Sequence, residues 1–387
     1  MSSVLGTYAR KPISFKNGKG SYLFSEKGEK YLDFVQGIAT NILGHCHEHL
    51  VEAIQEQSKK LWHISNAFII SEQERLAKRL TENTFADFVC FQNSGTEATE
   101  ASIKIARKYF HKIGKPEKNR IITFKGAFHG RTLAALFAAN NPKHTEGFGP
   151  RIEGFDQVPF ADHKAIEKAI NNNTAAIMIE TIMGEGGIKV VPDVCLQGLR
   201  KLCNEHEILL ILDEVQSAYR TGNFFAFEKS GISPDIVPIA KGIGGGFPLG
   251  ACLVTKKVSI GMTPGTHGST FGGNPLAMSV GNAVLDILFE KDFFKKVKQK
   301  GEYLDAGLKN IKKKFPKIIA EIRGIGLMKG IKLLVDNSEF IEKLIEHRML
   351  TVKAEENVIR LFPPLIVSNQ ELDEAIHKIQ KVCEEMS

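Results

Sequence analysis

Short apolar runs alternate along the chain with amphipathic segments. Runs that are hydrophobic at nearly every position occur at 88–92, 121–124, 176–179, 208–212, 236–239 and 251–254. Continuous apolar character is typical of strands covered on both faces, as in a parallel sheet flanked by helices. Helical periodicity lies between these runs at 96–110, 164–171 and 194–207. The alternation predicts an α/β protein with a mostly parallel sheet.

The pattern changes after residue 272. Long amphipathic stretches follow at 276–289 and 293–315, with short strand-like segments at 326–333 and 358–361. The first 45 residues hold two more strand-like segments, 20–24 and 30–34, around a Glu-Lys-Gly turn. We therefore expect a large domain at residues 46–272 and a smaller α+β domain formed by residues 1–45 and 273–387.

Composition and charge exclude several classes of protein. Of 387 residues, 43% are hydrophobic and 25% charged, and 51 Lys plus Arg against 44 Asp plus Glu give a net charge of +7. The basic residues are dispersed over helical faces, so we expect no nucleic-acid partner; a basic nucleic-acid-binding protein is the rival outside the enzymes. Apolar runs fall short of the roughly 18 residues of a membrane span. The six cysteines lack paired spacing and the N-terminus lacks a signal-peptide core, which predicts a cytoplasmic protein without a membrane partner.

Polar or glycine-rich sequence follows four of the apolar runs directly. In open parallel sheets, ligands bind beyond the carboxyl ends of the strands, so one cleft is expected to collect all four segments. They are Asn93-Ser94-Gly95-Thr96, Lys125-Gly126-Ala127-Phe128-His129-Gly130-Arg131-Thr132, Asp213-Glu214-Val215-Gln216 and Ala240-Lys241-Gly242.

The residue types in these segments favour an anionic ligand and a reactive amine. Gly95 and Thr96 open a helix whose free N–H groups favour a phosphate, although a plainly capped helix fits the pattern equally well. Phe128 beside glycines can lie against a planar ring or belong to the core, and Arg131 offers a bidentate fork for a carboxylate. Lys241 is a candidate nucleophile because desolvation lowers the pKa of a lysine.

Carboxylates and histidines raise the question of a metal. Asp213 follows an all-apolar strand and needs a cationic or hydrogen-bonding partner, and metal binding by Asp213 and Glu214, as in a phosphotransferase, is the rival interpretation. A second cluster consists of His45, Cys46, His47 and His49. Its spacing is closer than that of usual zinc sites, so we expect no metal. The glycines after Lys241 also lack the spacing of a dinucleotide fingerprint.

In chain order, these motifs resemble the class III aminotransferases, fold-type I enzymes that use pyridoxal 5′-phosphate. The resemblance spans nearly the whole chain. Its motifs are Tyr31-Leu32-Asp33-Phe34, Leu43-Gly44-His45, Ser94-Gly95-Thr96-Glu97-Ala98, Phe128-His129-Gly130-Arg131-Thr132, Gly184-Glu185-Gly186-Gly187, Asp213-Glu214-Val215-Gln216, Lys241 and Thr270-Phe271-Gly272-Gly273-Asn274-Pro275. The resemblance implies a mostly parallel, seven-stranded sheet in the large domain.

The resemblance also implies a role for each residue of the site. Lys241 would bond covalently to the cofactor and transfer a proton, and Asp213 would pair with the pyridinium nitrogen. The other cofactor-binding residues would be Ser94, Gly95, Thr96, Phe128, His129, Val215 and Gln216, together with Thr270, which would reach the cofactor of a second subunit. The substrate-binding residues would be Arg131, Ser269, Arg360 and Glu185, which would cover Arg360 while the amino donor is bound.

Within the class, the Phe-His-Gly-Arg-Thr motif and Arg360-Leu361-Phe362-Pro363-Pro364-Leu365 are most similar to the acetylornithine aminotransferases. The implied reaction converts N2-acetylornithine and 2-oxoglutarate to N-acetylglutamate 5-semialdehyde and glutamate in arginine biosynthesis, in a homodimer with shared active sites. The alternatives are related enzymes acting on succinyl-diaminopimelate, succinylornithine, ornithine or 4-aminobutyrate, and an aminomutase or decarboxylase of the same fold. One departure is Glu180-Thr181-Ile182-Met183, where the family usually has Glu-Pro-x-Gln; it removes a rigid proline and any glutamine hydrogen bond.

Overall fold

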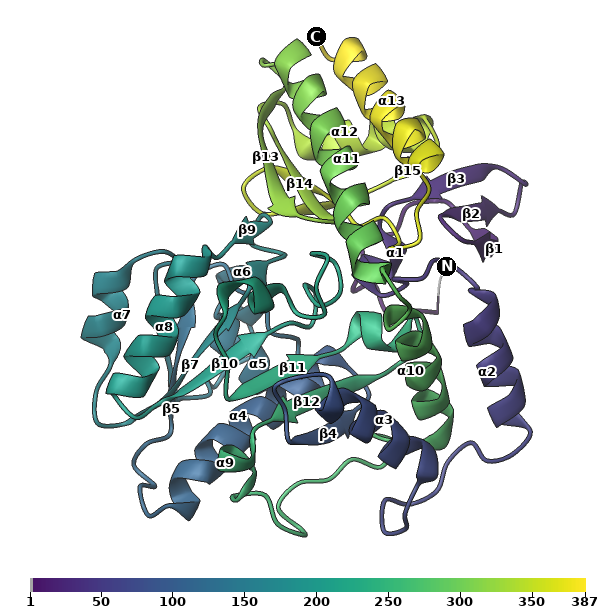
Figure 1. Cartoon of the computed structure of the whole chain (residues 1–387). Coiled ribbons are helices and arrows are strands. Elements are labelled where there is room, and N and C mark those ends of the chain that lie inside the picture. Colours follow the sequence, from purple (N-terminus) through teal and green to yellow (C-terminus); the bar gives the residue numbers. More distant parts are fainter. Residues whose placement is uncertain (1–2) are drawn as a thin grey trace.

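The computed structural model describes residues 3–387 and is built around one large sheet and several smaller ones (Figure 1). The large sheet has the order β4 (Phe88–Gln92), β12 (Gly250–Val254), β11 (Ile236–Ile239), β10 (Leu209–Asp213), β7 (Thr174–Glu180), β5 (Arg120–Phe124), β6 (Phe155–Val158). Strands β11, β10, β7, β5 and β6 are mutually parallel, whereas β12 is antiparallel to both of its neighbours. The predicted α/β class and the mostly parallel, seven-stranded sheet are confirmed.

Two strands of this sheet differ from the sequence-based expectation. The run at 251–254 reads like a parallel strand but forms the antiparallel β12, because segment 240–249 holds only a short 3-10 turn, η2 (Lys241–Gly244). A parallel connection needs a crossover of about a dozen residues or more. The edge strand β6 was not expected, since its centre is polar; Asp156 there pairs with Arg120 of β5 at 2.6 Å.

Helices cover both faces of the large sheet. On β10, Leu209 and Ile211 face one hydrophobic cluster with α4, whereas Leu210 and Leu212 face a second cluster with α8. This period of two explains why the strand is apolar throughout. The helices of this region are α2 (Glu48–Ser58), α3 (Ser71–Glu82), α4 (Gly95–Lys112), α5 (Leu133–Ala139), α6 (Pro142–Thr145), α7 (His163–Ala169), α8 (Asp193–Glu205), α9 (Lys256–Ser259) and α10 (Pro275–Leu288).

The remaining elements bring the two ends of the chain together. One four-stranded sheet consists of β1 (Phe15–Lys19), β2 (Tyr22–Ser25), β3 (Lys30–Asp33) and β15 (Met349–Leu350), and the other of β13 (Ile319–Ile325), β14 (Met328–Leu333), β17 (Val358–Leu361) and β16 (Val352–Ala354). Around them lie α1 (Gln36–Ala39), α11 (Phe293–Lys314), α12 (Asn337–Glu346) and α13 (Asn369–Glu385). Figure 1 shows the N-terminal strands, in purple, beside the C-terminal elements, in yellow.

The predicted division into residues 46–272 and residues 1–45 plus 273–387 stays a prediction, and residues 1–2 lie outside the described part of the chain. The pairing of β3 with β15 does join N-terminal and C-terminal segments.

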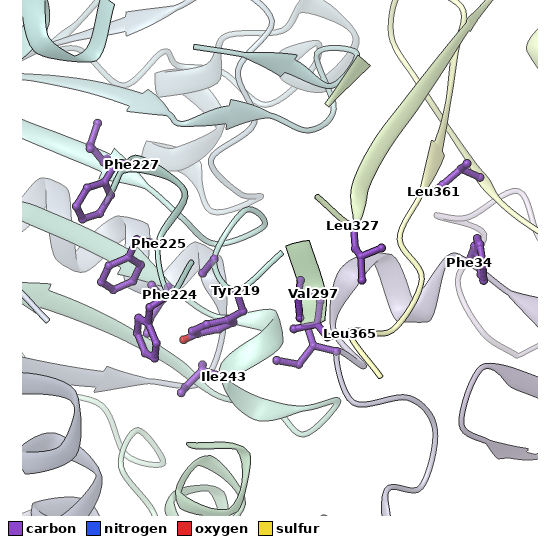
Figure 2. Packing of buried hydrophobic residues seen from close by; sticks show 14 of the residues in the cluster. Phe34, Tyr219, Phe224, Phe225, Phe227, Ile243, Val297, Leu327, Leu361 and Leu365 are labelled. Atoms are coloured by element: carbon purple, nitrogen blue, oxygen red, sulfur yellow. The ribbon is translucent and has the colours of Figure 1, made fainter. Parts of the chain in front are cut away.

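One hydrophobic cluster continues from the large sheet into these smaller sheets. Figure 2 shows Tyr219 and Ile243 from the segments after β10 and β11, near Val297 of α11 and Leu365. All four side chains are at most 1% exposed. The carboxyl ends of the large sheet are therefore fixed against the C-terminal part of the chain.

Two further observations concern the described residues as a whole. Among residues 3–387, no helix combines the length and the apolar character needed to cross a lipid bilayer. The six cysteines are all free thiols.

Candidate active site

A cavity of about 410 Å³ lies beyond the carboxyl ends of β4, β5, β10 and β11. The segments that follow these four strands all contribute to its wall. The predicted site residues in the wall are Ser94, Gly95, Thr96, Phe128, His129, Arg131, Glu185, Asp213, Val215, Gln216 and Lys241. The sheet thus brings together side chains that lie up to 147 positions apart in the chain (94 to 241).

Asp213 ends the buried strand β10, and each of its carboxylate oxygens accepts a hydrogen bond. Its Oδ2 accepts a hydrogen bond from Nδ1 of His129 at 2.8 Å, and its Oδ1 accepts one from the Val215 N–H at 3.0 Å. Burial favours the neutral form of the His129 ring, but the hydrogen bond and charge of Asp213 outweigh it and raise the pKa of His129. The two hydrogen bonds hold the Asp213 carboxylate in a fixed orientation at the wall of the cavity.

Lys241 is the amine of the cavity. It lies two residues after the end of β11 and has a φ of 46°, a left-handed backbone conformation that is rare for residues other than glycine. Burial and the nearby charge of Arg360 lower the pKa of Lys241 to about 8. Among the described residues, no hydrogen bond or ion pair holds its Nζ. The amine is therefore available for chemistry close to neutral pH.

The helix start after β4 forms another part of the wall. Ser94 is the N-cap of α4, and its Oγ accepts from the Glu97 N–H at 3.3 Å. The Thr96 Oγ1 accepts from the backbone N–H groups of Arg131 and Thr132, both at 3.2 Å, which ties the helix start to the segment after β5. The first N–H groups of an α-helix have no partner inside the helix, so this end suits an anion.

Two arginines differ in their environment. Arg131 is exposed at the cavity, and within residues 3–387 no carboxylate pairs with its guanidinium. Arg360 of β17 is only 1% exposed, and its Nη1 donates to Glu185 Oε1 at 2.7 Å. Its Nη2 donates to the carbonyl of Lys353 at 2.8 Å. The site therefore offers one open guanidinium and one that a carboxylate covers.

Ser269 and Thr270 lie outside this cavity. They line a neighbouring hollow, where the Ser269 Oγ accepts from Asn93 Nδ2 at 3.1 Å, and Thr270 is exposed. Asn93 belongs to the walls of both the cavity and this hollow. The structure does not bring Thr270 to the cofactor cavity of its own chain.

Sequence reasoning missed Glu180. It ends β7, is 5% exposed, and its two carboxylate oxygens accept from the N–H groups of Phe128 at 2.8 Å and Gly184 at 3.1 Å. Burial raises the pKa of Glu180 to about 7, against the opposing charge of His129. The signal was available, since Glu180, like Asp213, is a carboxylate at the end of an all-apolar run.

The segment that replaces Glu-Pro-x-Gln forms a hairpin. Strands β8 (Ile182–Met183) and β9 (Lys189–Val190) pair through Ile182–Val190 and Met183–Lys189, and Glu185 lies in their connecting loop. Ile182 and Met183 are at most 1% exposed. Strand pairing and burial therefore stiffen this segment where proline is missing.

The rival metal interpretations find no support in the geometry. Glu214 is buried and accepts from Ser217 Oγ at 2.6 Å and from the Phe227 N–H at 3.2 Å, so it does not join Asp213. His45 pairs with Asp33 and His49 with Asp286, on separate elements. Within residues 3–387, no three His, Cys, Asp or Glu side chains are grouped to hold a metal ion.

The cavity wall fits pyridoxal phosphate, a planar ring that carries a phosphate, a nitrogen and a phenolic oxygen. The start of α4 suits the phosphate and Asp213 suits the ring nitrogen. The Gln216 Oε1 is buried without a hydrogen-bond partner in the described chain, as expected for an amide that awaits a ligand. A Cβ on Gly95 would lie 2.7 Å from Cγ1 of Val215, so glycine is required at this helix start.

Comparison with known proteins gives a consistent family. The family model described as aminotransferase class-III matches residues 6–383. Acetylornithine aminotransferase from Agrobacterium fabrum is 54% identical over 378 residues, which cover 97% of this chain and 95% of that protein. The protein of the same name from Mesorhizobium japonicum is 54% identical over 380 residues, covering 98% and 95%.

Solved structures of aminotransferases agree with this family. The ornithine aminotransferase from Toxoplasma gondii superposes with a TM-score of 0.95 at 31% identity, over 99% of this chain and 93% of that one. The N-acetylornithine aminotransferase from Stenotrophomonas maltophilia superposes with a TM-score of 0.85 at 33% identity, over 98% and 97%. Matches that extend over almost the full length of the chain leave one conclusion, that it belongs to the class III aminotransferases and is a pyridoxal-phosphate-dependent enzyme.

Proposed function

We propose that the protein transfers the distal amino group of N2-acetylornithine to 2-oxoglutarate, giving N-acetylglutamate 5-semialdehyde and glutamate in arginine biosynthesis. The names of two curated relatives that are 54% identical to this chain support this reaction. The observation that carries it is the contrast between the open Arg131 and Arg360, which Glu185 covers. A donor with one carboxylate needs one free guanidinium, whereas a dicarboxylate such as 2-oxoglutarate needs two.

The residues of the cavity divide the work of this reaction. When bound, pyridoxal phosphate supplies a ring that withdraws electrons from the substrate carbon. Asp213, held by His129 and the Val215 N–H, would be the residue that pairs with the ring nitrogen. The Lys241 Nζ would take the proton from the carbon of the amino donor in the first half-reaction and deliver a proton to the carbon of the oxo acid in the second, a role that its lowered pKa permits.

Glu185 and the two arginines determine which substrate binds and in which orientation. Arg131 binds the α-carboxylate of the amino donor while Glu185 stays on Arg360, so the donor's amine points toward Lys241. When 2-oxoglutarate enters, Glu185 leaves Arg360, which then binds the second carboxylate. The Glu185 side chain is 34% exposed and can move into solvent, whereas the backbone carbonyl of Lys353 holds Arg360 in place.

A second copy of the chain completes the proposal. Thr270 lies outside its own cavity, and the exposed apolar side chains of Trp62, Phe68, Ile69 and Phe271 are candidates for a subunit interface. We therefore propose a homodimer in which Thr270 reaches the partner's cofactor.

Free thiols support a cytoplasmic location. The joined N- and C-terminal strands support the two-domain division at residues 45/46 and 272/273.

Half-reactions measured separately test this function. The purified enzyme is mixed with acetylornithine, succinylornithine, succinyl-diaminopimelate, ornithine or 4-aminobutyrate, and the loss of the cofactor's visible absorbance is followed. We expect acetylornithine to react with the highest kcat/KM, and 2-oxoglutarate to restore the absorbance with formation of glutamate. Another donor reacting faster would replace acetylornithine as the substrate. Absence of glutamate would favour an aminomutase.

Replacement of Lys241 tests the chemistry. Lys241→Ala removes the proton carrier, and we expect transamination to fall by at least about a hundredfold with loss of the yellow colour. Lys164→Ala, on the exposed face of α7, is the matched control and should behave like the wild type. Normal turnover by the Lys241 variant would contradict the proposal.

A further inference from the structure

The loop that carries Glu185 rests on a turn between β16 and β17. The backbone N–H of Glu355 donates to the carbonyl of Glu185 at 2.9 Å. Gly187 is packed against the same turn, since a Cβ there would lie 3.1 Å from the Glu355 carbonyl. The loop is thus in contact with the strand that bears Arg360, the partner of Glu185.

A carboxylate next to this turn joins the loop to the C-terminal sheet. Glu356 pairs with Lys189 of β9 at 2.5 Å and with Arg323 of β13 at 2.8 Å. The same Nη1 of Arg323 donates to the carbonyl of Gly187 at 3.0 Å. Partial burial opposes ionisation, yet Lys189 and Arg323 hold the pKa of Glu356 at about 2, so the carboxylate is charged at every working pH.

Apolar packing supports the ionic contacts from below. Ile182 and Ile188 of the hairpin lie in one buried cluster with Met328, Val358 and Phe362 of the C-terminal part. The hairpin backbone is therefore held on both sides, whereas the Glu185 side chain remains partly exposed. Glu185 can therefore leave Arg360 by rotation of its side chain, while the backbone of the loop stays in place.

We propose that Lys189, Arg323 and Glu356 are positioning residues that set how firmly Glu185 covers Arg360, and thereby the discrimination between the amino donor and the dicarboxylate. The inference rests on the proposed function. None of these three residues lines the cavity. They act on the reaction through the backbone at Glu185 and Gly187.

Glu356→Gln tests the inference because it keeps the size of the side chain and removes its charge. The loop loosens, Glu185 covers Arg360 less firmly, and Arg360 is open to carboxylates. We expect the ratio of kcat/KM for the amino donor to kcat/KM for glutamate to fall about threefold to tenfold. The visible absorbance of the bound cofactor stays as in the wild type.

The affinity for a dicarboxylate that cannot react provides a second test. Glutarate has two carboxylates but no amino or keto group, and we expect its dissociation constant to fall in Glu356→Gln. Glu207→Gln is the matched control, since Glu207 is an exposed carboxylate paired with Lys115 at 3.2 Å. Lys189→Gln breaks only one ion pair of Glu356 and serves where Glu356→Gln folds poorly.

A double variant separates positioning from general structure. In a Glu185→Ala background, Glu356→Gln should leave the ratio unchanged, because Glu185 no longer transmits the effect. An equal shift in both backgrounds, or an unchanged ratio in the single variant, overturns the inference. If the wild type uses another amino donor, the proposed substrate is wrong, and the same ratio is measured with that donor.

Discussion

At the residue scale, three ionisable side chains lie at or just after the ends of buried strands, and each has a different set of partners. Asp213 has His129 and a backbone N–H, Glu180 has two backbone N–H groups, and Lys241 has no hydrogen-bonding partner among residues 3–387. Burial without a partner disfavours the charged form of an amine, which lowers its pKa. The left-handed backbone of Lys241 adds local strain at the residue that reacts.

The lowered pKa of Lys241 predicts a pH dependence. Only the neutral amine can bond to the cofactor's aldehyde, so the uptake of pyridoxal phosphate by cofactor-free protein should rise with pH and level off above about pH 8. Arg360→Gln removes a nearby positive charge, which raises the pKa of the amine and moves the curve to higher pH. Absorbance after rapid mixing measures the rate of cofactor uptake at each pH, in the wild type and in Arg360→Gln. A wild-type rate that still rises above about pH 10, where an ordinary lysine titrates, would contradict the prediction.

At the element scale, the site depends on loops that are tied to one another across the sheet edge. Glu180 of β7 holds the segment with Phe128 and the loop that begins at Gly184, and Thr96 of α4 holds the segment with Arg131. The bonds from Phe128 and from Arg131 each join the segment after β5 to the end of another strand or the helix start after it. These parts of the cavity wall are therefore joined to one another rather than independent loops.

Glu180→Gln should break one of these ties. The amide replaces an accepting oxygen by an NH2 group that faces a backbone N–H, so one buried donor loses its partner. We expect the free energy of unfolding at pH 8 to fall by about 1–3 kcal/mol. Urea unfolding measures this loss. The control is Glu167→Gln, on an exposed position of α7, and equal stability of the two variants would show that the tie is unimportant.

At the scale of the whole molecule, the segment between α2 and α3 exposes large apolar side chains. Trp62 is 65% and Ile69 86% exposed, and Phe271, in the segment that holds Thr270, is 59% exposed. The rings of His63 and Phe271 contact each other in a tilted arrangement with centroids 5.0 Å apart, which joins the two segments into one surface. A second copy of the chain would bury this surface and bring Thr270 to its cavity.

Ile69→Lys should therefore weaken the dimer. A charge in the proposed apolar interface would be costly to bury, so sedimentation should show more monomer at equal concentration, together with lower activity. Val194→Lys introduces the same charge at a 72% exposed position of α8 and should leave the sedimentation unchanged. A monomeric wild type would contradict the proposed assembly.

The amino-acid sequence by itself determined the class of fold and most of the cavity wall. The apolar run 236–239 became a strand with those bounds, because burial on both faces requires an apolar side chain at every position. The run 88–92 became the edge strand β4 with the same bounds. Asp213 and Lys241 met in one cavity because the carboxyl ends of parallel strands share one edge of the sheet. The roles of Arg360 and Glu185 came from the family resemblance rather than from a local pattern.

Only the tertiary structure decided the contacts between distant segments. The antiparallel direction of β12, the two N–H bonds of Glu180 and the contacts of Glu356 with Lys189 and Arg323 depend on how separate segments pack. Hydrophobic periodicity reports which face of an element is buried, but not which element will cover it. Charges in partly exposed turns, such as that of Glu356, carry no periodic signal, so their partners are defined only once the chain has folded.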